Sequence, residues 1–192
     1  MSLKKYSEEE KLYTEVVIAG FGGQGVIFSG KLLAYAGLKE GREVVYYPSY
    51  GAEMRGGAAN CTVIVSDSMI PSPIISHPQS GILMSYPALK RFLPRIREGG
   101  YVVVNTSLTG EDIKREEIEV VKVPANSIAQ NLGNSRTANM VALGVWACIS
   151  RVVSLESLIL SLKEVLSPDK FSLLELNENC LRQGWEFASQ SN

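Results

Sequence analysis

Short apolar runs alternate along the chain with glycine-bearing turns and longer amphipathic stretches. The β-branched run at 16–19 (VVIA) ends at a glycine and predicts a buried strand. The stretch 26–41 carries good helix formers and stops at Gly41, as helices often do. A further apolar run at 43–47 predicts a second strand. This strand–helix–strand order predicts an α/β domain built on a mainly parallel sheet covered by helices.

The remaining apolar runs predict four more strands and four helices. The strands are expected at 61–65, 81–85, 101–104 and 118–123. The helices are expected at 88–96, 136–149, 155–166 and 171–188. The helix at 136–149 is apolar nearly all round, which predicts burial in the core or against another chain. A homodimer of the isolated chain is therefore one expectation.

Length and composition predict one domain at 15–188 behind a polar N-terminal leader at 1–14. The 192 residues, 45% of them hydrophobic, fit one globular core. The leader lacks the apolar segment of a signal peptide, and no run approaches the about 20 apolar residues of a membrane span. We therefore expect a cytoplasmic protein. Its net charge of −1 argues against binding to nucleic acid or to an anionic membrane.

The residue types of metal centres and of common catalytic sites are scarce. The three cysteines, Cys61, Cys148 and Cys180, are far apart in sequence and are expected to be reduced core thiols. An iron–sulfur cluster usually needs four thiolates, and a structural zinc site needs four nitrogen or sulfur ligands. The single histidine, His77, lies in a proline-rich loop and is expected at the surface. No metal site and no catalytic residue are predicted for this chain alone.

The glycine-rich stretch GFGGQG follows the first predicted strand and opens the first predicted helix. Gly20, Gly22 and Gly25 satisfy G-x-G-x-x-G, which suits a phosphate-bearing ligand at a helix N-terminus. A dinucleotide site also needs an acidic residue at the end of the second strand. That strand has Glu43 at its start and Tyr47 near its end. A stand-alone nucleotide-binding module or dehydrogenase remains the alternative, and glycines that serve only helix packing or a protein contact remain open.

A second unusual loop, SYGAEMRGG at 49–57, follows the second predicted strand. Tyr50 offers an aromatic surface, Glu53 a carboxylate and Arg55 a planar fork for a phosphate or carboxylate. Ligands of open α/β sheets bind beyond the carboxyl ends of the strands, so the two loops are expected to be neighbours. A solvated turn is the competing interpretation.

Polar residues also gather where the helix at 136–149 begins. They are Asn134, Ser135, Arg136, Thr137 and Asn139. Helix capping explains this cluster more simply than substrate binding does.

Several motifs together resemble a known family, the gamma subunits of 2-oxoacid:ferredoxin oxidoreductases. They are GFGGQGV, PSYGAEMRGG, the strand at 61–66, IPSP at 70–73 and NMVALG at 139–144, and the similarity spans 15–187. Within the family, the 2-oxoglutarate enzymes are the most similar, beside those acting on pyruvate and ketoisovalerate. The resemblance implies a Rossmann-like, doubly wound fold with helices on both faces of the sheet.

The resemblance also implies a function that depends on other chains. Such a subunit serves the coenzyme A-dependent oxidative decarboxylation of a 2-oxoacid to acyl-CoA, carbon dioxide and reduced ferredoxin, and is inactive alone. Alpha and beta subunits hold thiamine diphosphate and magnesium, and a ferredoxin-like subunit holds [4Fe-4S] clusters. No cofactor is expected to bind tightly to this chain.

The family signatures carry over to two sets of residues, expected to contact coenzyme A or a neighbouring subunit. The first set is Gly20, Gly22, Gly23, Gln24 and Gly25, and the second is Tyr50, Gly51, Glu53, Arg55, Gly56 and Gly57. Arg55 is the expected charge partner of the coenzyme A phosphates.

Overall fold

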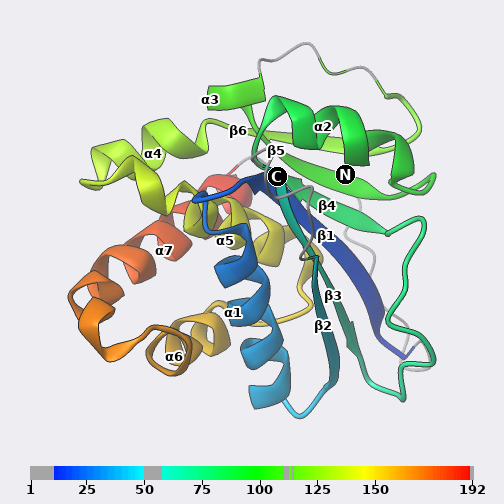
Figure 1. The fold of residues 1–192 in the computed structure, drawn as a ribbon, viewed down its shortest axis with the longest axis horizontal. Helices are drawn as coiled ribbons and strands as arrows, with labels where there is room; N and C mark the ends of the chain where they lie inside the picture. Colours follow the sequence, from blue (N-terminus) through cyan, green and yellow to red (C-terminus); the bar gives the residue numbers. More distant parts are fainter. Residues whose placement is uncertain (1–10, 50–57, 110–112, 114, 191–192) are drawn as a thin grey trace.

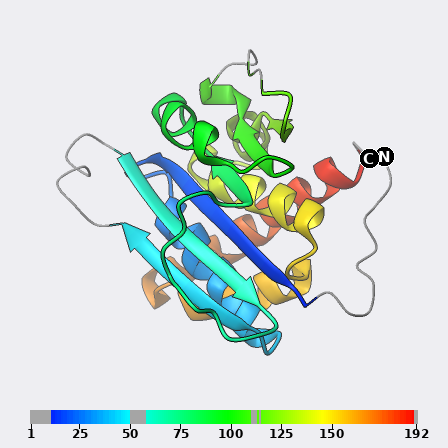
Figure 2. The same cartoon turned by 90° about the vertical axis from the view of Figure 1, so that its right-hand side faces the viewer.

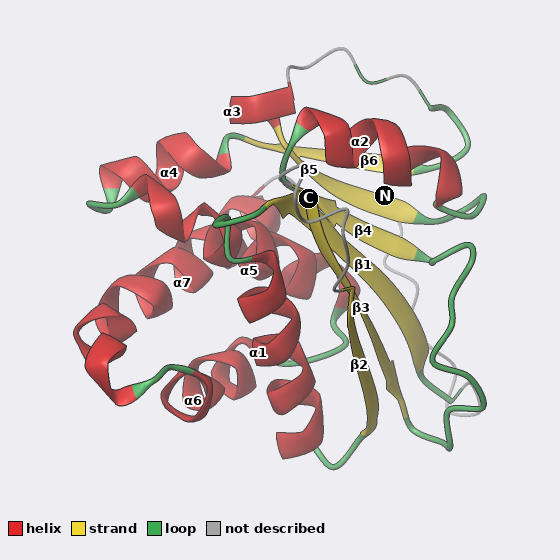
Figure 3. Cartoon of the chain, in the orientation of Figure 1, coloured by secondary structure: helices red, strands yellow, loops and turns green. Residues whose placement is uncertain are grey.

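The computed structural model describes residues 11–49, 58–109, 113 and 115–190. These residues form an α/β fold with one six-stranded sheet and helices on both of its faces (Figures 1 and 3). The strands are β1 (Tyr13–Phe21), β2 (Glu43–Ser49), β3 (Ala58–Ser66), β4 (Ser80–Leu83), β5 (Tyr101–Asn105) and β6 (Glu119–Val123). The α-helices are α1 (Val26–Lys39), α2 (Tyr86–Phe92), α3 (Thr106–Thr109), α4 (Ala125–Asn131), α5 (Ala138–Ser150), α6 (Leu155–Val165) and α7 (Leu174–Gln190). Short 3₁₀ turns are η2 (Leu93–Arg95), η3 (Ser135–Thr137) and η4 (Pro168–Leu173).

The sheet is mainly parallel, as predicted, but one strand runs against the others. The strand order is β2-β3-β1-β4-β5-β6. β1, β4, β5 and β6 pair in parallel, whereas β3 is antiparallel to both β1 and β2. The predicted strand–helix–strand unit is therefore present, with β3 inserted between its two strands. The connection at 50–57 is too short for a parallel crossover, which needs a dozen or more residues, so β3 returns antiparallel.

The first two helices, α1 and α2, cover opposite faces of the sheet, which confirms the doubly wound architecture. α1 and α5 lie against one face, with α6 and α7 packed outside them, whereas α2 lies on the other face (Figure 1). β1 leads into α1, and its parallel neighbour β4 leads into α2. The helices thus change faces between β1 and β4. In folds of this type, ligands bind in the crevice at that point, beyond the carboxyl ends of the strands.

Helix α5 is the centre of the larger core. Twelve of its 13 residues are buried. Its Trp146 is fully buried and donates its indole N–H to Ser80 Oγ at 3.0 Å, so its one polar atom has a partner. The cover comes from the same chain, chiefly from α7, α4 and the sheet. Of the two environments predicted for this helix, the structure has the core, so its apolar character gives no reason to expect a homodimer.

Two glycines allow α5 and α7 to approach each other closely. A Cβ on Gly144 would overlap the carbonyl oxygen of Leu181, and a Cβ on Gly184 would overlap that of Val141. Both obstacles are backbone atoms, which move only if a whole helix moves. The glycines therefore fix the spacing of the two helices.

The first prediction concerns this helix contact. Gly184→Ala should destabilise the protein by about 1–3 kcal/mol, because the overlap with Val141 exceeds the gain of up to ~1 kcal/mol in helix propensity. Urea denaturation measures the change. The neighbouring exposed Gln183→Ala is the matched control and should stay within about 0.5 kcal/mol of the wild type. A more stable Gly184→Ala protein would contradict the close packing.

The second prediction concerns the Cys61 thiol. Burial raises the pKa of Cys61 from its ordinary value of 9.0 to about 12. The folded protein therefore keeps a proton that the unfolded chain loses above about pH 9, and the associated stability is complete below that pH and is lost as the pH rises. Between pH 9 and 11 the free energy of unfolding should fall more steeply in the wild type than in Cys61→Ala, by up to ~1.4 kcal/mol per pH unit. The free energy of unfolding is measured by urea denaturation at each pH. If it fell equally steeply in both proteins, the Cys61 thiol would ionise as readily in the folded protein as in the unfolded chain.

Candidate functional site

The glycine turn joins β1 to α1 at the point where the helices change faces. Two of its residues have left-handed backbone angles, Gly23 with φ 89° and Gly25 with φ 71°. The turn is closed by a hydrogen bond from the Gln24 N–H to the carbonyl of Phe21 at 3.2 Å. Side chains other than glycine rarely adopt these angles, so the local backbone accounts for two of the four glycines.

The Gln24 side chain ties this turn to the neighbouring strand. Its Oε1 accepts a hydrogen bond from the Phe21 N–H at 2.6 Å, and its Nε2 donates to the carbonyl of Met84 at 3.3 Å. The same side chain occupies the space that a Cβ on Gly20 would need, together with Met84 and Val26. Gln24 therefore links the turn to the residue after β4, and Gly20 leaves room for the Gln24 side chain.

Gly25 is likewise covered by the protein itself. The Asn139 amide lies where a Cβ on Gly25 would project. Its Nδ2 donates to the Gly25 carbonyl at 3.1 Å and to Ser29 Oγ at 3.0 Å, which fixes the first turn of α1 on the start of α5. Side chains of this chain therefore fill the space beside Gly20 and Gly25, and the external contact expected of these two glycines stays a prediction.

Gly22 and Gly23 form the open part of the turn. Both are exposed, and no atom lies within 4 Å of the Cβ position of Gly23. Gly23 and Gln24 border a cavity of about 140 Å³. Its other lining residues follow β4, begin α4 and α5 or belong to η3, and are Met84, Asn126, Ser135, Arg136 and Ala138. The cavity therefore lies at the crevice where this type of sheet binds ligands.

The polar cluster before α5 has two roles. Asn134 Oδ1 accepts from the Arg136 N–H at 3.0 Å and caps η3, so the predicted capping is confirmed there. Arg136 is exposed and lines the cavity beside Gly23, a role that the sequence analysis missed. One signal was available: a cation at the start of a helix is unfavourable in the helix dipole, which suggests another reason for its presence.

A buried amide network holds the helices that frame this cavity. The fully buried Asn105 ends β5, donates to Asn126 Oδ1 at 2.7 Å and accepts from the Ala125 N–H at 3.2 Å. Asn126 in turn donates to the Ser135 carbonyl at 3.4 Å. These contacts position α4 and η3 against the carboxyl end of the sheet.

The second predicted set lies outside the described residues. It consists of Tyr50, Gly51, Glu53, Arg55, Gly56 and Gly57. The residues that flank it, Ser49 and Ala58, are placed by the sheet. Ala58 pairs with Phe21, and Ser49 pairs with Asn60 beside Ala19. The chain thus leaves and re-enters the sheet at the edge that carries the glycine turn.

The residue types that metal sites require do not converge in the described part of the chain. The three cysteines are free and buried, as predicted, and lie on β3, α5 and α7. His77 is exposed, also as predicted. Among the described residues, no group of three or more histidine, cysteine or acidic side chains has the geometry of a metal site. No described helix combines the length and the apolar character of a membrane span.

Comparisons with known proteins agree on one family. The model of the pyruvate ferredoxin/flavodoxin oxidoreductase family matches residues 15–187. The 2-oxoglutarate synthase subunit KorC of Methanocaldococcus jannaschii is 34% identical over 184 residues, covering 94% of this chain and 96% of the relative. The ketoisovalerate oxidoreductase subunit VorA of Methanothermobacter marburgensis is 41% identical over 134 residues, covering 70% of this chain. The matches span 28% and 36% of the two VorA relatives.

A solved structure shares the fold. The gamma subunit of keto/oxoacid ferredoxin oxidoreductase from Geobacter sulfurreducens superimposes with a TM-score of 0.80 at 27% identity, over 92% of this chain and 99% of that subunit. The family match covers the whole sheet and the helices around it, from Glu15 in β1 to Phe187 in α7. The chain belongs to the pyruvate ferredoxin/flavodoxin oxidoreductase family.

Proposed function

We propose that this chain is the gamma-type subunit of a multi-subunit 2-oxoacid:ferredoxin oxidoreductase. The observation that carries the proposal is the family match over 15–187, together with near-complete coverage of a KorC subunit. The complex would convert a 2-oxoacid and coenzyme A to acyl-CoA and carbon dioxide and pass the electrons to ferredoxin. The relatives are named for 2-oxoglutarate and ketoisovalerate, so the proposed substrate is 2-oxoglutarate or a related 2-oxoacid.

The chemistry of this reaction is assigned to the partner chains. A [4Fe-4S] cluster needs four converging thiolates, whereas Cys61, Cys148 and Cys180 are buried on three separate elements. The residues of this chain therefore do not fit a cluster. Thiamine diphosphate with magnesium is assigned to alpha and beta subunits, and the clusters to a ferredoxin-like subunit. Reduced thiols of this kind persist in the cytoplasm, which is the proposed location.

The proposed contribution of this chain is a surface for coenzyme A or for a neighbouring subunit. Gly22 and Gly23 present bare main chain at the crevice, and Arg136 supplies a cation on the same cavity. The N-terminus of α1 carries no side-chain cap, and its N–H groups favour an anion. Phosphate oxygens of coenzyme A match this chemistry. The predicted contacts of Tyr50, Glu53 and Arg55 belong to the same proposal.

The topology speaks against a stand-alone dehydrogenase. In a dinucleotide-binding fold, the second strand lies next to the first, and its final acidic residue reaches the ribose. Here β3 separates β1 from β2, and β2 ends in Tyr47, Pro48 and Ser49. In the described part of the chain, the ribose contact is therefore missing in both position and chemistry.

The third prediction tests the role of the chain in the complex. Co-expression with alpha, beta and ferredoxin-like chains should give coenzyme A-dependent reduction of a viologen dye by a 2-oxoacid. The complex purified without this chain should lose at least 90% of the rate, a tenfold effect equal to about 1.4 kcal/mol. Full activity without the chain would refute the proposal. Micromolar binding of NAD, NADP or FAD to the isolated chain in calorimetry would favour the dehydrogenase instead.

The fourth prediction separates a coenzyme A contact from a subunit contact. Arg136→Ala should raise the KM for coenzyme A about tenfold with little change in kcat, as expected for a lost charge-assisted contact of ~1.5–3 kcal/mol. Arg182→Ala is the matched control, since Arg182 is exposed on α7 and pairs with Glu178. Arg55→Ala tests the second set in the same assay. An unchanged KM with impaired assembly would assign these residues to a subunit contact.

A further inference from the structure

Among the described residues, no helix covers one half of the sheet on the face that α2 covers elsewhere. On this face, Leu89 and Phe92 of α2 pack over β1, β4 and β5 together with Ile96, which follows η2. Tyr47 of β2 and its cross-strand partner Thr62 of β3 extend the same face beyond that helix. The segment between β3 and β4 runs across this half of the sheet as an irregular strip (Figure 2).

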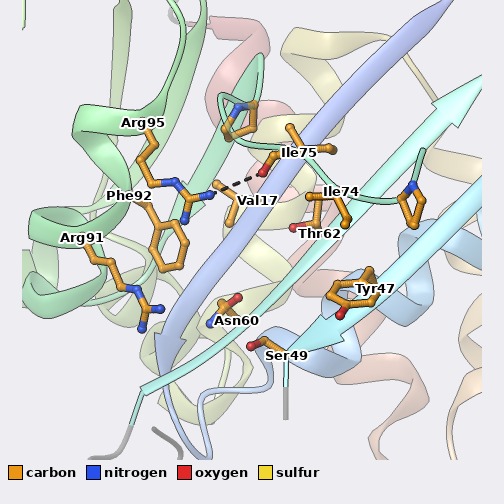
Figure 4. Close-up of a pocket in the computed structure, with 12 residues that line it drawn as sticks. Val17, Tyr47, Ser49, Asn60, Thr62, Ile74, Ile75, Arg91, Phe92 and Arg95 are labelled. Atoms are coloured by element: carbon orange, nitrogen blue, oxygen red, sulfur yellow. Dashed lines mark hydrogen bonds between the residues drawn. The ribbon is translucent and has the colours of Figure 1, made fainter. Parts of the chain in front are cut away.

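A cavity of about 280 Å³ lies between this strip and α2 (Figure 4). Its walls come from three strands, from α2 and η2, and from the strip. Val17, Asn60 and Thr62 come from β1 and β3, Tyr47 and Ser49 from β2, Arg91, Phe92 and Arg95 from α2 and η2, and Pro73, Ile74, Ile75 and Pro78 from the strip. The cavity volume lies just below the range of about 300–1,000 Å³ that is usual for small-molecule pockets.

One wall of the cavity is cationic. The guanidinium groups of Arg91 and Arg95 both lie 5.4 Å from the centre of the Phe92 ring. Arg95 also donates to the carbonyls of Ile75 and Ser76, at 3.3 and 3.2 Å, which fixes the strip to η2. None of the described residues that line the cavity is acidic. An incoming carboxylate would meet two cations and no like charge from the lining.

The opposite rim is apolar and exposed. Ile74 is 76% exposed and Tyr47 is 56% exposed, although both are large apolar side chains that line the cavity. Their surfaces continue outside the cavity, where a small ligand would leave them in water. Tyrosine and arginine are also the residues that most often dominate protein–protein interfaces.

We propose that this cavity docks an acidic segment of a partner subunit. An apolar or aromatic side chain of the segment enters between Ile74, Tyr47 and Phe92, and a neighbouring carboxylate lies beside Arg91 and Arg95. The proposal rests on the proposed function only in requiring partner chains. The surface is separate from the cavity at the glycine turn, because the two share no lining residue.

The test measures binding of this chain to its co-expressed alpha, beta and ferredoxin-like partners by biolayer interferometry. Arg91→Glu should raise the dissociation constant at least tenfold, because it places a negative charge opposite the acidic segment. Lys90→Glu is the matched control: the charge change is the same, but Lys90 lies over the Tyr86 ring and does not line the cavity. It should change the constant twofold or less.

A second pair of variants tests the apolar rim. Ile74→Asp should weaken binding at least tenfold, whereas Leu160→Asp, at an exposed leucine of α6, should not. Raising the salt from 50 to 500 mM should weaken wild-type binding more than that of Arg91→Glu. Circular dichroism and thermal melting establish that each variant is folded.

Each alternative outcome has a defined meaning. An active complex in which Arg91→Glu and Ile74→Asp bind like the wild type overturns this inference and leaves the proposed function standing. Self-association of the isolated chain that Ile74→Asp abolishes assigns the cavity to a second copy and overturns it. Binding of coenzyme A or ADP that Arg91→Glu abolishes assigns it to a small anion and also overturns it. Failure of the wild type to bind any partner refutes both proposals.

Discussion

The side-chain amide of Gln24 joins the two strands between which the helices change faces. It accepts from the Phe21 N–H and donates to the Met84 carbonyl, so the turn after β1 is fixed to the end of β4. Each such bond contributes only about 1 kcal/mol, but together they decide where the main chain of the turn lies. The side chain of Gln24 folds inward over Gly20. For this reason Gly22 and Gly23 remain at the surface of the crevice. The hydrogen bonds of the Gln24 side chain therefore explain why Gly22 and Gly23 are exposed.

The rigidity of that site depends on α5, which is buried on all sides and begins beside the turn. Asn139 in its first turn holds the Gly25 carbonyl and Ser29, and Trp146 further along it reaches Ser80 at the start of β4. Helix α5 is thus fixed both to the first turn of α1 and to the opposite end of the sheet. The close contact with α7 at Gly144 and Gly184 prevents it from shifting. The described part of this surface offers bare main chain and the cation of Arg136, so the proposed ligand contact there would depend on such support.

Much of the fold could be predicted because its strands are short apolar runs, three of which end at glycine or proline. Each of the six predicted strands is present, and Ser154 caps α6, the helix expected at 155–166. The direction of β3 was harder to predict, because the apolar pattern shows which face of a strand is buried and not which way the strand runs. The short length of the eight-residue connection at 50–57 was the signal that predicts an antiparallel return. In the site, the roles of Gly20 and Gly25 depend on Met84 and Asn139, which are distant in sequence. A glycine motif alone does not show whether a ligand or the protein itself fills the space beside it.

The two cavities lie near the same edge of the sheet but on different sides of β1. The cavity at the glycine turn is framed by α4 and α5, which belong to one face, and the cationic cavity by α2 and the strip at 67–79, which belong to the other. The segment 50–57 leaves the sheet at Ser49, which lines the second cavity, and re-enters at Ala58, which pairs with Phe21 in the glycine turn. The two residues that flank this segment, Ser49 and Ala58, therefore lie one at the cationic cavity and the other beside the glycine turn. β1 contributes Val17 to the cationic cavity and leads into the turn that carries Gly23, so this strand would fix the position of the proposed partner chain relative to the proposed ligand.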